Sequence, residues 1–164
     1  MTLKIGAVGF PYGTPSTEEK LADMEKDKLL GCGEFDITNN IEFIKKGDYE
    51  AMLKELKTLV AAANGTTTKV IVETPQLTDE EIVKAAQIVL ESGATFIKTG
   101  TGHFGPTTMH HVQLINETVG GKLKIKAASG IRDLKTVEEM MANGVSRFGI
   151  GIRGIKGIIE ELGG

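Results

Sequence analysis

The sequence predicts an α/β protein built on a parallel sheet, and three observations carry this prediction. Short runs rich in β-branched residues alternate with longer runs that have helical periodicity. Helix start and stop signals stand between the strand-like runs. The strand-like runs also recur at the spacing of βα units, which is typical of parallel strands joined by helical crossovers.

In chain order, each strand-like run is short and is followed by a turn or a helical segment. The predicted strands are residues 3–8, 34–38, 69–73, 95–99, 123–127 and 147–150. The helices between them are indicated by residues that cap helix N-termini and by glycines that end helices. The predicted caps and stops are Asp48 with Asn64 and Gly65, a capping box of Thr78 and Glu81 with Gly93, and a capping box of Thr136 and Glu139 with Asn143 and Gly144.

Composition indicates one soluble domain covering residues 1–164, because a chain of this length builds one core and contains no segment that reads as a linker. Hydrophobic residues make up 40% and charged residues 25% of the chain, as in soluble globular proteins. The net charge of −3 argues against nucleic acid or a membrane surface as the main partner. A single cysteine and a polar start that is not a signal peptide lead us to expect a cytoplasmic protein.

Two parallel architectures remain at this point, an open doubly wound sheet and a (β/α) barrel. Residues 149–154 match the G-x-G-x-x-G pattern of dinucleotide sites. That pattern needs an acidic residue about 20 positions further on, which this sequence does not provide. We therefore interpret these glycines as a strand–loop–helix turn, which in barrels often binds phosphate.

Lys98 ends a strand-like run, is preceded by apolar residues and is followed closely by glycines. Lys126 ends another such run. Burial and a neighbouring positive charge both favour the neutral, nucleophilic form of an amine. Two such lysines suit an enzyme that forms a Schiff base with a carbonyl substrate. Solvated strand ends are the alternative interpretation of either lysine taken alone.

Several motifs together resemble deoxyribose-phosphate aldolases, which are class I aldolases with a TIM-barrel fold. The resemblance covers almost the whole chain in the family's order. It rests on Lys98-Thr-Gly-Thr-Gly102, Lys126-Ala-Ala-Ser-Gly-Ile-Arg132 and Arg147-Phe-Gly149, and on residues 8–13, 34–36, 47–50, 69–74 and 77–81.

The resemblance implies reversible cleavage of 2-deoxyribose 5-phosphate to acetaldehyde and glyceraldehyde 3-phosphate. It implies that Lys98 is the Schiff-base lysine, that Lys126 is the second lysine promoting its neutral form, and that Asp36 belongs to the proton relay. The residues it places in the phosphate-binding loops are Ser129, Gly130, Arg132, Gly149, Gly151 and Arg153. We expect no cofactor or metal, because the iminium is itself the electron sink and the adjacent His110 and His111 point different ways on a helix.

This sequence also departs from the family pattern. Ser129 stands where the family usually has a glycine, and Gly151 and Ile152 stand where it usually has small hydroxyl residues. The chain resembles the third to eighth βα units, so we expect a TIM-barrel-type fold truncated to six units. The first and last strands would then be open edges, which a homo-oligomer could cover. A related class I aldolase with another aldehyde substrate, and an inactive truncated barrel acting as a binding or structural partner, remain as alternatives.

Overall fold

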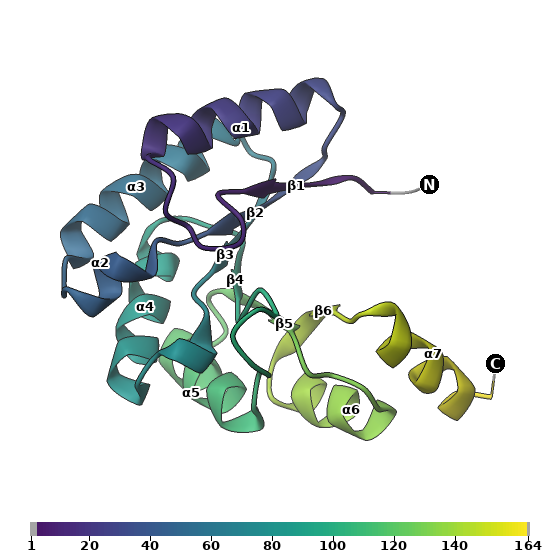
Figure 1. Cartoon of the computed structure of the whole chain (residues 1–164). Coiled ribbons are helices and arrows are strands. Elements are labelled where there is room, and N and C mark those ends of the chain that lie inside the picture. Colours follow the sequence, from purple (N-terminus) through teal and green to yellow (C-terminus); the bar gives the residue numbers. More distant parts are fainter. Residues whose placement is uncertain (1–2, 164) are drawn as a thin grey trace.

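The computed structural model describes residues 3–163 and contains a six-stranded parallel sheet in the order β1-β2-β3-β4-β5-β6 (Figure 1). Each strand lies beside its neighbour in sequence, and helices form the crossovers. The strands are β1 (Ile5–Val8), β2 (Glu34–Thr38), β3 (Thr67–Ile71), β4 (Phe96–Lys98), β5 (Lys124–Ala128) and β6 (Val145–Gly149). The helices are α1 (Thr17–Leu29), α2 (Ile41–Lys45), α3 (Tyr49–Ala62), α4 (Asp79–Glu91), α5 (Met109–Val119), α6 (Leu134–Ala142) and α7 (Ile152–Glu161), with a 3₁₀ turn η1 (Thr74–Gln76). The predicted α/β class is confirmed, as a partial TIM-barrel-like fold.

Two of the three predicted helix caps are confirmed and one is wrong. Asp48 caps α3, and Thr78 forms the expected capping box at α4. The predicted box of Thr136 and Glu139 does not form, because α6 begins earlier, at Leu134. Asp133 is its N-cap and accepts a 2.8 Å hydrogen bond from the Thr136 backbone N–H, so Thr136 lies inside the first turn.

The two faces of the sheet differ in chemistry because successive side chains of a strand point to opposite sides. The helix-facing side is apolar and forms the core. Its buried strand residues include Val8, Phe35, Ile37, Val70, Ile97, Ile125 and Ala127, which pack with residues such as Met24, Met52, Leu56, Ile82, Val89, Val112 and Ile115 of the helices. The opposite, inner face carries charged side chains, and this alternation is what positions the candidate site.

The sheet has two edges within residues 3–163, since β1 pairs only with β2 and β6 pairs only with β5. Helix α7 lies at the β6 end of the molecule (Figure 1). Large apolar side chains are exposed near both edges: Leu3 and Ile5 at β1, and Ile152, Ile155, Ile159 and Leu162 on α7. We refer to these residues, at the two edges together, as the apolar edge surface.

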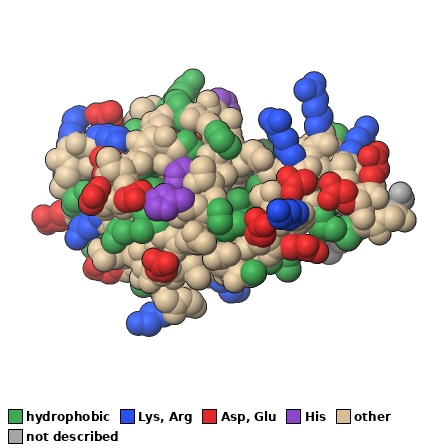
Figure 2. Space-filling model, turned by 90° about the horizontal axis from the view of Figure 1, so that it is seen from below, with side chains coloured by type: hydrophobic (Ala, Val, Ile, Leu, Met, Phe, Trp, Pro, Cys, Tyr) green, Lys and Arg blue, Asp and Glu red, His purple; other side chains and the backbone are tan. Residues whose placement is uncertain are grey.

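The remaining surface is mixed in charge where it is visible. Figure 2 shows acidic and basic side chains interspersed on the face seen from below, with neither sign dominating it. No helix in residues 3–163 combines the length and the apolar character that a membrane crossing requires.

Candidate active site

Strands β2, β4 and β5 bring charged side chains together on the inner face of the sheet. Asp36 lies in the middle of β2, Lys98 ends β4 and Lys126 lies within β5. Lys98 and Lys126 are register partners in adjacent parallel strands, so their side chains leave the sheet on the same side. All three side chains are buried.

Asp36 is the hub of this cluster. Its Oδ2 atom accepts hydrogen bonds from the Lys98 Nζ at 2.7 Å and from the Lys126 Nζ at 2.9 Å. Its Oδ1 atom accepts a third from the Lys69 Nζ at 2.8 Å. The structure thus brings together the three residues to which the family resemblance assigns catalytic roles, and it adds Lys69.

The electrostatics of the cluster follow from one carboxylate shared by three ammonium groups. Burial alone would raise the pKa of Asp36, but the charge of Lys98 and the hydrogen bonds from the three lysines hold that pKa far below its ordinary value. Burial, and then the charge of Lys98, lower the pKa of Lys126 although Asp36 opposes them. Asp36 is therefore ionised at neutral pH. Within the lysine cluster, which consists of Lys69, Lys98 and Lys126, the Lys126 ammonium group loses its proton more readily than an ordinary lysine.

Sequence reasoning did not identify the residues that extend the cluster. The fully buried Lys69 also contacts Glu34 on β2, with 2.7 Å between Nζ and Oε2. Arg147 on β6 donates a hydrogen bond to the same Glu34 oxygen. Glu34 has a lowered pKa because, although burial raises it, its bonds with Lys69 and Arg147 lower it. A signal existed in the sequence: Lys69 is a charged residue at the start of an otherwise apolar run, 69–72.

A buried carboxylate holds the loop that follows Lys98. Glu73, just after β3, accepts hydrogen bonds from the backbone N–H of Thr101, 3.1 Å from Oε2, and from the Thr101 hydroxyl at 2.6 Å. Its backbone lies in the left-handed region, with φ of 61°, which is uncommon for residues other than glycine. An alanine Cβ at Gly100 would lie 2.8 Å from Glu73 Oε1, so Gly100 permits the close approach.

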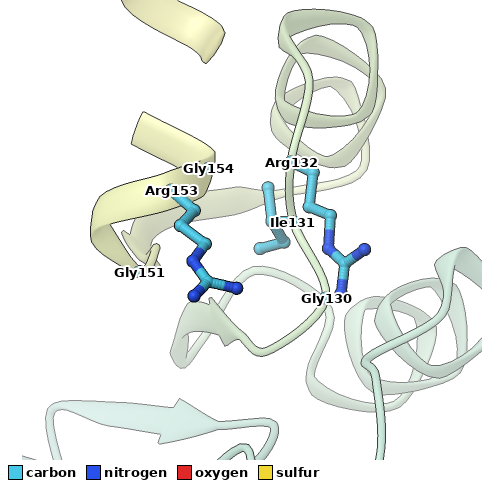
Figure 3. A pocket seen from close by; sticks show the side chains of 6 residues that line it. All are labelled: Gly130, Ile131, Arg132, Gly151, Arg153 and Gly154. Carbon is cyan, nitrogen blue, oxygen red and sulfur yellow. The ribbon is translucent and has the colours of Figure 1, made fainter. Parts of the chain in front are cut away.

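Beyond the carboxyl ends of β5 and β6 lies a cavity of about 320 Å³, lined by Gly130, Ile131, Arg132, Gly151, Arg153 and Gly154. Figure 3 shows Arg132, after β5, and Arg153, on α7, with Ile131 between them. Gly151 is the N-cap of α7 and supplies no side-chain cap, so the first backbone N–H groups of that helix have no capping partner from it. A helix N-terminus with two arginines has the chemistry of an anion site.

Four of the six residues expected in the phosphate loops line this cavity, and Ser129 and Gly149 do not. The Ser129 hydroxyl donates to the Gly105 carbonyl oxygen at 2.6 Å, which ties the loop after β5 to the loop after β4. A Cβ at Gly149 would lie 3.0 Å from Ala128 Cβ and 3.6 Å from Lys126 Cε. The missing Cβ of Gly149 therefore mainly leaves room for Ala128 on the neighbouring strand.

The histidines lie outside this cluster. The His110 Nε2 is 2.9 Å from the Asp79 carboxylate, and the His111 Nδ1 is 3.1 Å from the Thr74 hydroxyl. His103 contacts the Phe10 ring, with 5.3 Å between ring centroids. Across the part of the chain that the structure describes, no group of three or more His, Cys, Asp or Glu residues is arranged to bind a metal ion.

A TIM-barrel-type α/β protein with a buried lysine cluster on the inner face of its sheet is the class that the fold and the site define. Comparison with known proteins then gives the family. The deoxyribose-phosphate aldolase of Staphylococcus saprophyticus is 40% identical over 157 residues, covering 94% of this chain and 71% of the relative. That of Rhizobium meliloti is 46% identical over 151 residues, covering 92% of this chain and 61% of the relative. The chain belongs to the deoxyribose-phosphate aldolase family, and it spans about three fifths of the Rhizobium protein.

Solved structures agree with this assignment. An aldolase named QR15 superposes with a TM-score of 0.91 at 39% identity, covering 98% of this chain and 72% of that one. The tetrameric deoxyribose phosphate aldolase from Aeropyrum pernix shares the fold, with a TM-score of 0.87 at 22% identity, covering 99% of this chain and 68% of that one. A scan against protein-family models found no match.

Proposed function

We propose that this protein is a class I aldolase that reversibly cleaves 2-deoxyribose 5-phosphate to acetaldehyde and glyceraldehyde 3-phosphate. The observation that carries the proposal is the buried Asp36 carboxylate on β2, which is shared by Lys98 of β4 and Lys126 of β5. Family membership supports the choice of substrate. The arginine-lined cavity supports a phosphorylated substrate, because it offers cationic groups and a helix N-terminus.

In the proposed mechanism, the neutral Lys98 amine attacks the C1 aldehyde of the open-chain sugar. Loss of water gives an iminium on Lys98. A base removes the proton of the C3 hydroxyl, the C2–C3 bond breaks, and its electron pair forms an enamine while C3 becomes the aldehyde of glyceraldehyde 3-phosphate. Protonation of the enamine at C2 and hydrolysis then release acetaldehyde and regenerate Lys98.

Lys126 and Asp36 serve this cycle as proton carriers. Lys126 has a lowered pKa, so it gives up its proton readily to a reacting group. While it is protonated, its positive charge favours the free-amine form of Lys98. Asp36 touches both lysines through Oδ2, and it moves protons to and from the reacting carbons through water. Arg132 and Arg153, with Gly130 and Gly151, would hold the phosphate. Ser129 supports the loop after β5, and Gly149 allows β6 to pack closely against Ala128 of β5.

Covalent trapping tests this assignment. Acetaldehyde with borohydride should leave one reduced adduct on Lys98 near neutral pH, located by mass spectrometry of peptides. Lys98→Ala should abolish the adduct, and Lys126→Leu should slow its formation. An adduct on Lys126 would reverse the two roles. No adduct, or equal labelling of many lysines, would favour an inactive barrel that acts as a binding partner.

One observation favours a second candidate, a related class I aldolase for a different aldehyde. The Ser129 hydroxyl is engaged with Gly105, and Gly151 and Ile152 offer no hydroxyl at the N-terminus of α7. A phosphate would therefore have fewer side-chain hydrogen bonds than the family pattern provides. Preference for an unphosphorylated aldehyde in a cleavage or condensation assay would support this candidate.

The proposal includes a homo-oligomer in the cytoplasm. The apolar edge surface supports self-association, because it combines a strand edge with exposed isoleucines. The tetrameric relative from Aeropyrum pernix is a precedent for assembly. The single cysteine in the sequence is compatible with a reducing compartment.

A further inference from the structure

Lys69 is the most deeply buried cation of the lysine cluster. Its side chain is fully buried, whereas those of Lys98 and Lys126 are 11% and 8% exposed. Burying an ammonium group is costly unless it is paired with anions. Lys69 has two such partners, Glu34 at 2.7 Å and Asp36 at 2.8 Å. It therefore spans two carboxylates of the same strand.

The strand register places Lys69 where it binds one carboxylate oxygen of Asp36 and leaves the other free for Lys98 and Lys126. Asp36 and Lys69 are direct register partners in β2 and β3. Lys69 occupies Oδ1 of Asp36, which leaves Oδ2 to Lys98 and Lys126. Arg147 of β6 also contacts Glu34, at the same Oε2 atom that Lys69 contacts. A chain of alternating charges thus runs from β6 through Glu34 and Lys69 to Asp36.

We propose that Lys69 is a positioning residue of the lysine site: it holds Oδ1 of Asp36, so that Oδ2 is presented to Lys98 and Lys126. The inference rests on the proposed function. Lys69 also pairs with Asp36, so the negative charge of this carboxylate is shared among Lys69, Lys98 and Lys126. Removal of the Lys69 ammonium group would strengthen the attraction between Asp36 and the ammonium groups of Lys98 and Lys126. It would also take one positive charge out of the site.

The charged groups on the inner face of the sheet determine in which direction a substitution changes the reactivity of Lys98. The charged groups around Lys69 are Glu34 and Asp36 from β2, Lys98 from β4, Lys126 from β5 and, beyond Glu34, Arg147 from β6. The neighbouring register positions of β1 are Ile5 and Ala7, which carry no charge. Lys69→Met makes the site less positive, and Glu34→Gln makes it more positive. The two variants should therefore change the reactivity of Lys98 in opposite directions.

The chain contains a matched control for a buried lysine that is only structural. Lys20 on α1 is also fully buried, and its Nζ lies 2.6 Å from Glu55 Oε1. This pair joins α1 to α3 and makes no bond with the lysine cluster. Lys20→Met therefore removes a buried ammonium group from the protein and leaves the charge of the site unchanged.

The experiment is reductive methylation of the folded protein with formaldehyde and cyanoborohydride across a pH series, followed by peptide mass spectrometry. The midpoint pH for modification of Lys98 should rise by about one unit in Lys69→Met, which lowers its reactivity about tenfold at pH values below the midpoint. Glu34→Gln should lower the midpoint. Lys20→Met should leave it at the wild-type value.

An unchanged midpoint in Lys69→Met, or shifts of the same sign in Lys69→Met and Glu34→Gln, would overturn the proposal. If Lys69→Met does not fold, the direction of the Glu34→Gln shift decides alone. Methylation requires no aldolase activity, so failure of the proposed function would be seen separately, as a missing acetaldehyde adduct in the wild-type protein. In an active enzyme, Lys69→Met should lower kcat near pH 7, with recovery at higher pH and little change in KM.

Discussion

At the residue scale, the lysine cluster concentrates more positive than negative charge in a buried space. Among the described residues, the buried Lys69, Lys98 and Lys126 form direct ion pairs with Glu34 and Asp36, and the partly exposed Arg147 also pairs with Glu34. A folded core normally avoids such an excess, because unpaired buried charge is costly. In a Schiff-base enzyme the same excess is useful, since it makes one amine give up its proton.

The lowered pKa of Lys126 has a consequence for stability. The folded protein binds this proton less tightly than the unfolded chain, whose lysines titrate near pH 10.4. Between the lowered pKa and about pH 10.4, the unfolded state holds more protons, so this residue makes the free energy of unfolding rise with pH. We expect Lys126→Met to remove up to about 1.4 kcal/mol of this rise per pH unit.

Urea unfolding at pH 7, 8, 9 and 10 measures this effect as a difference between wild type and variant. Lys124→Met is the control, because Lys124 lies two residues earlier on the same strand and is exposed. The control should follow the pH dependence of the wild type. If the free energy of unfolding changed with pH in the same way in wild type and in Lys126→Met, folding would not lower the affinity of Lys126 for its proton.

At the element scale, the N-terminus of α6 depends on Asp133. The Asp133 carboxylate accepts from both the backbone N–H and the hydroxyl of Thr136, and these bonds lower its pKa. Asp133→Ala should lower the free energy of unfolding, because the first turn of α6 loses its N-cap. Glu139→Ala should cost much less, because Glu139 forms no capping box. Equal losses of stability in the two variants would instead support the capping box of Thr136 and Glu139 that the sequence predicts.

The loop after β5 and helix α7 together form the anion cavity, so substrate discrimination belongs to this scale as well. Arg132→Ala should raise KM for the phosphorylated substrate about tenfold or more, since a charge-assisted contact contributes about 1.5–3 kcal/mol. KM for the free sugar should change little. Lys135→Ala, which removes a largely exposed lysine on α6, should affect neither substrate. Equal effects of Arg132→Ala on both substrates would place the phosphate elsewhere.

At the scale of the whole molecule, the apolar edge surface predicts self-association. Light scattering at micromolar concentration should report an oligomer. The double variant Ile155→Lys and Ile159→Lys should shift it toward a monomer, because it places charge on the exposed face of α7. Thr58→Lys is the control, since Thr58 is exposed on α3, a helix that packs between α1 and α4. A wild-type monomer that unfolds cooperatively would contradict the predicted assembly.

The sequence by itself determined the order of strands and helices, the family and the placement of Asp36, Lys98 and Lys126 on strands. These properties are local or motif-based: β-branched runs, caps such as Asp48, and the lysine and glycine motifs can all be seen in short windows. The third helix cap failed because Asp133 and Thr136 compete for the same helix start, and sequence spacing alone does not decide between them.

Only the tertiary structure decided how the charges are shared. Glu34, Lys69 and Arg147 come from three strands that lie far apart in the chain, and their contacts depend on strand register and on which face each side chain occupies. The same holds for Ser129, whose hydroxyl is engaged by a carbonyl 24 residues away. A residue's type can be read from the sequence, but its partners follow from packing, because hydrogen bonds and ion pairs act only at distances that the folded chain sets.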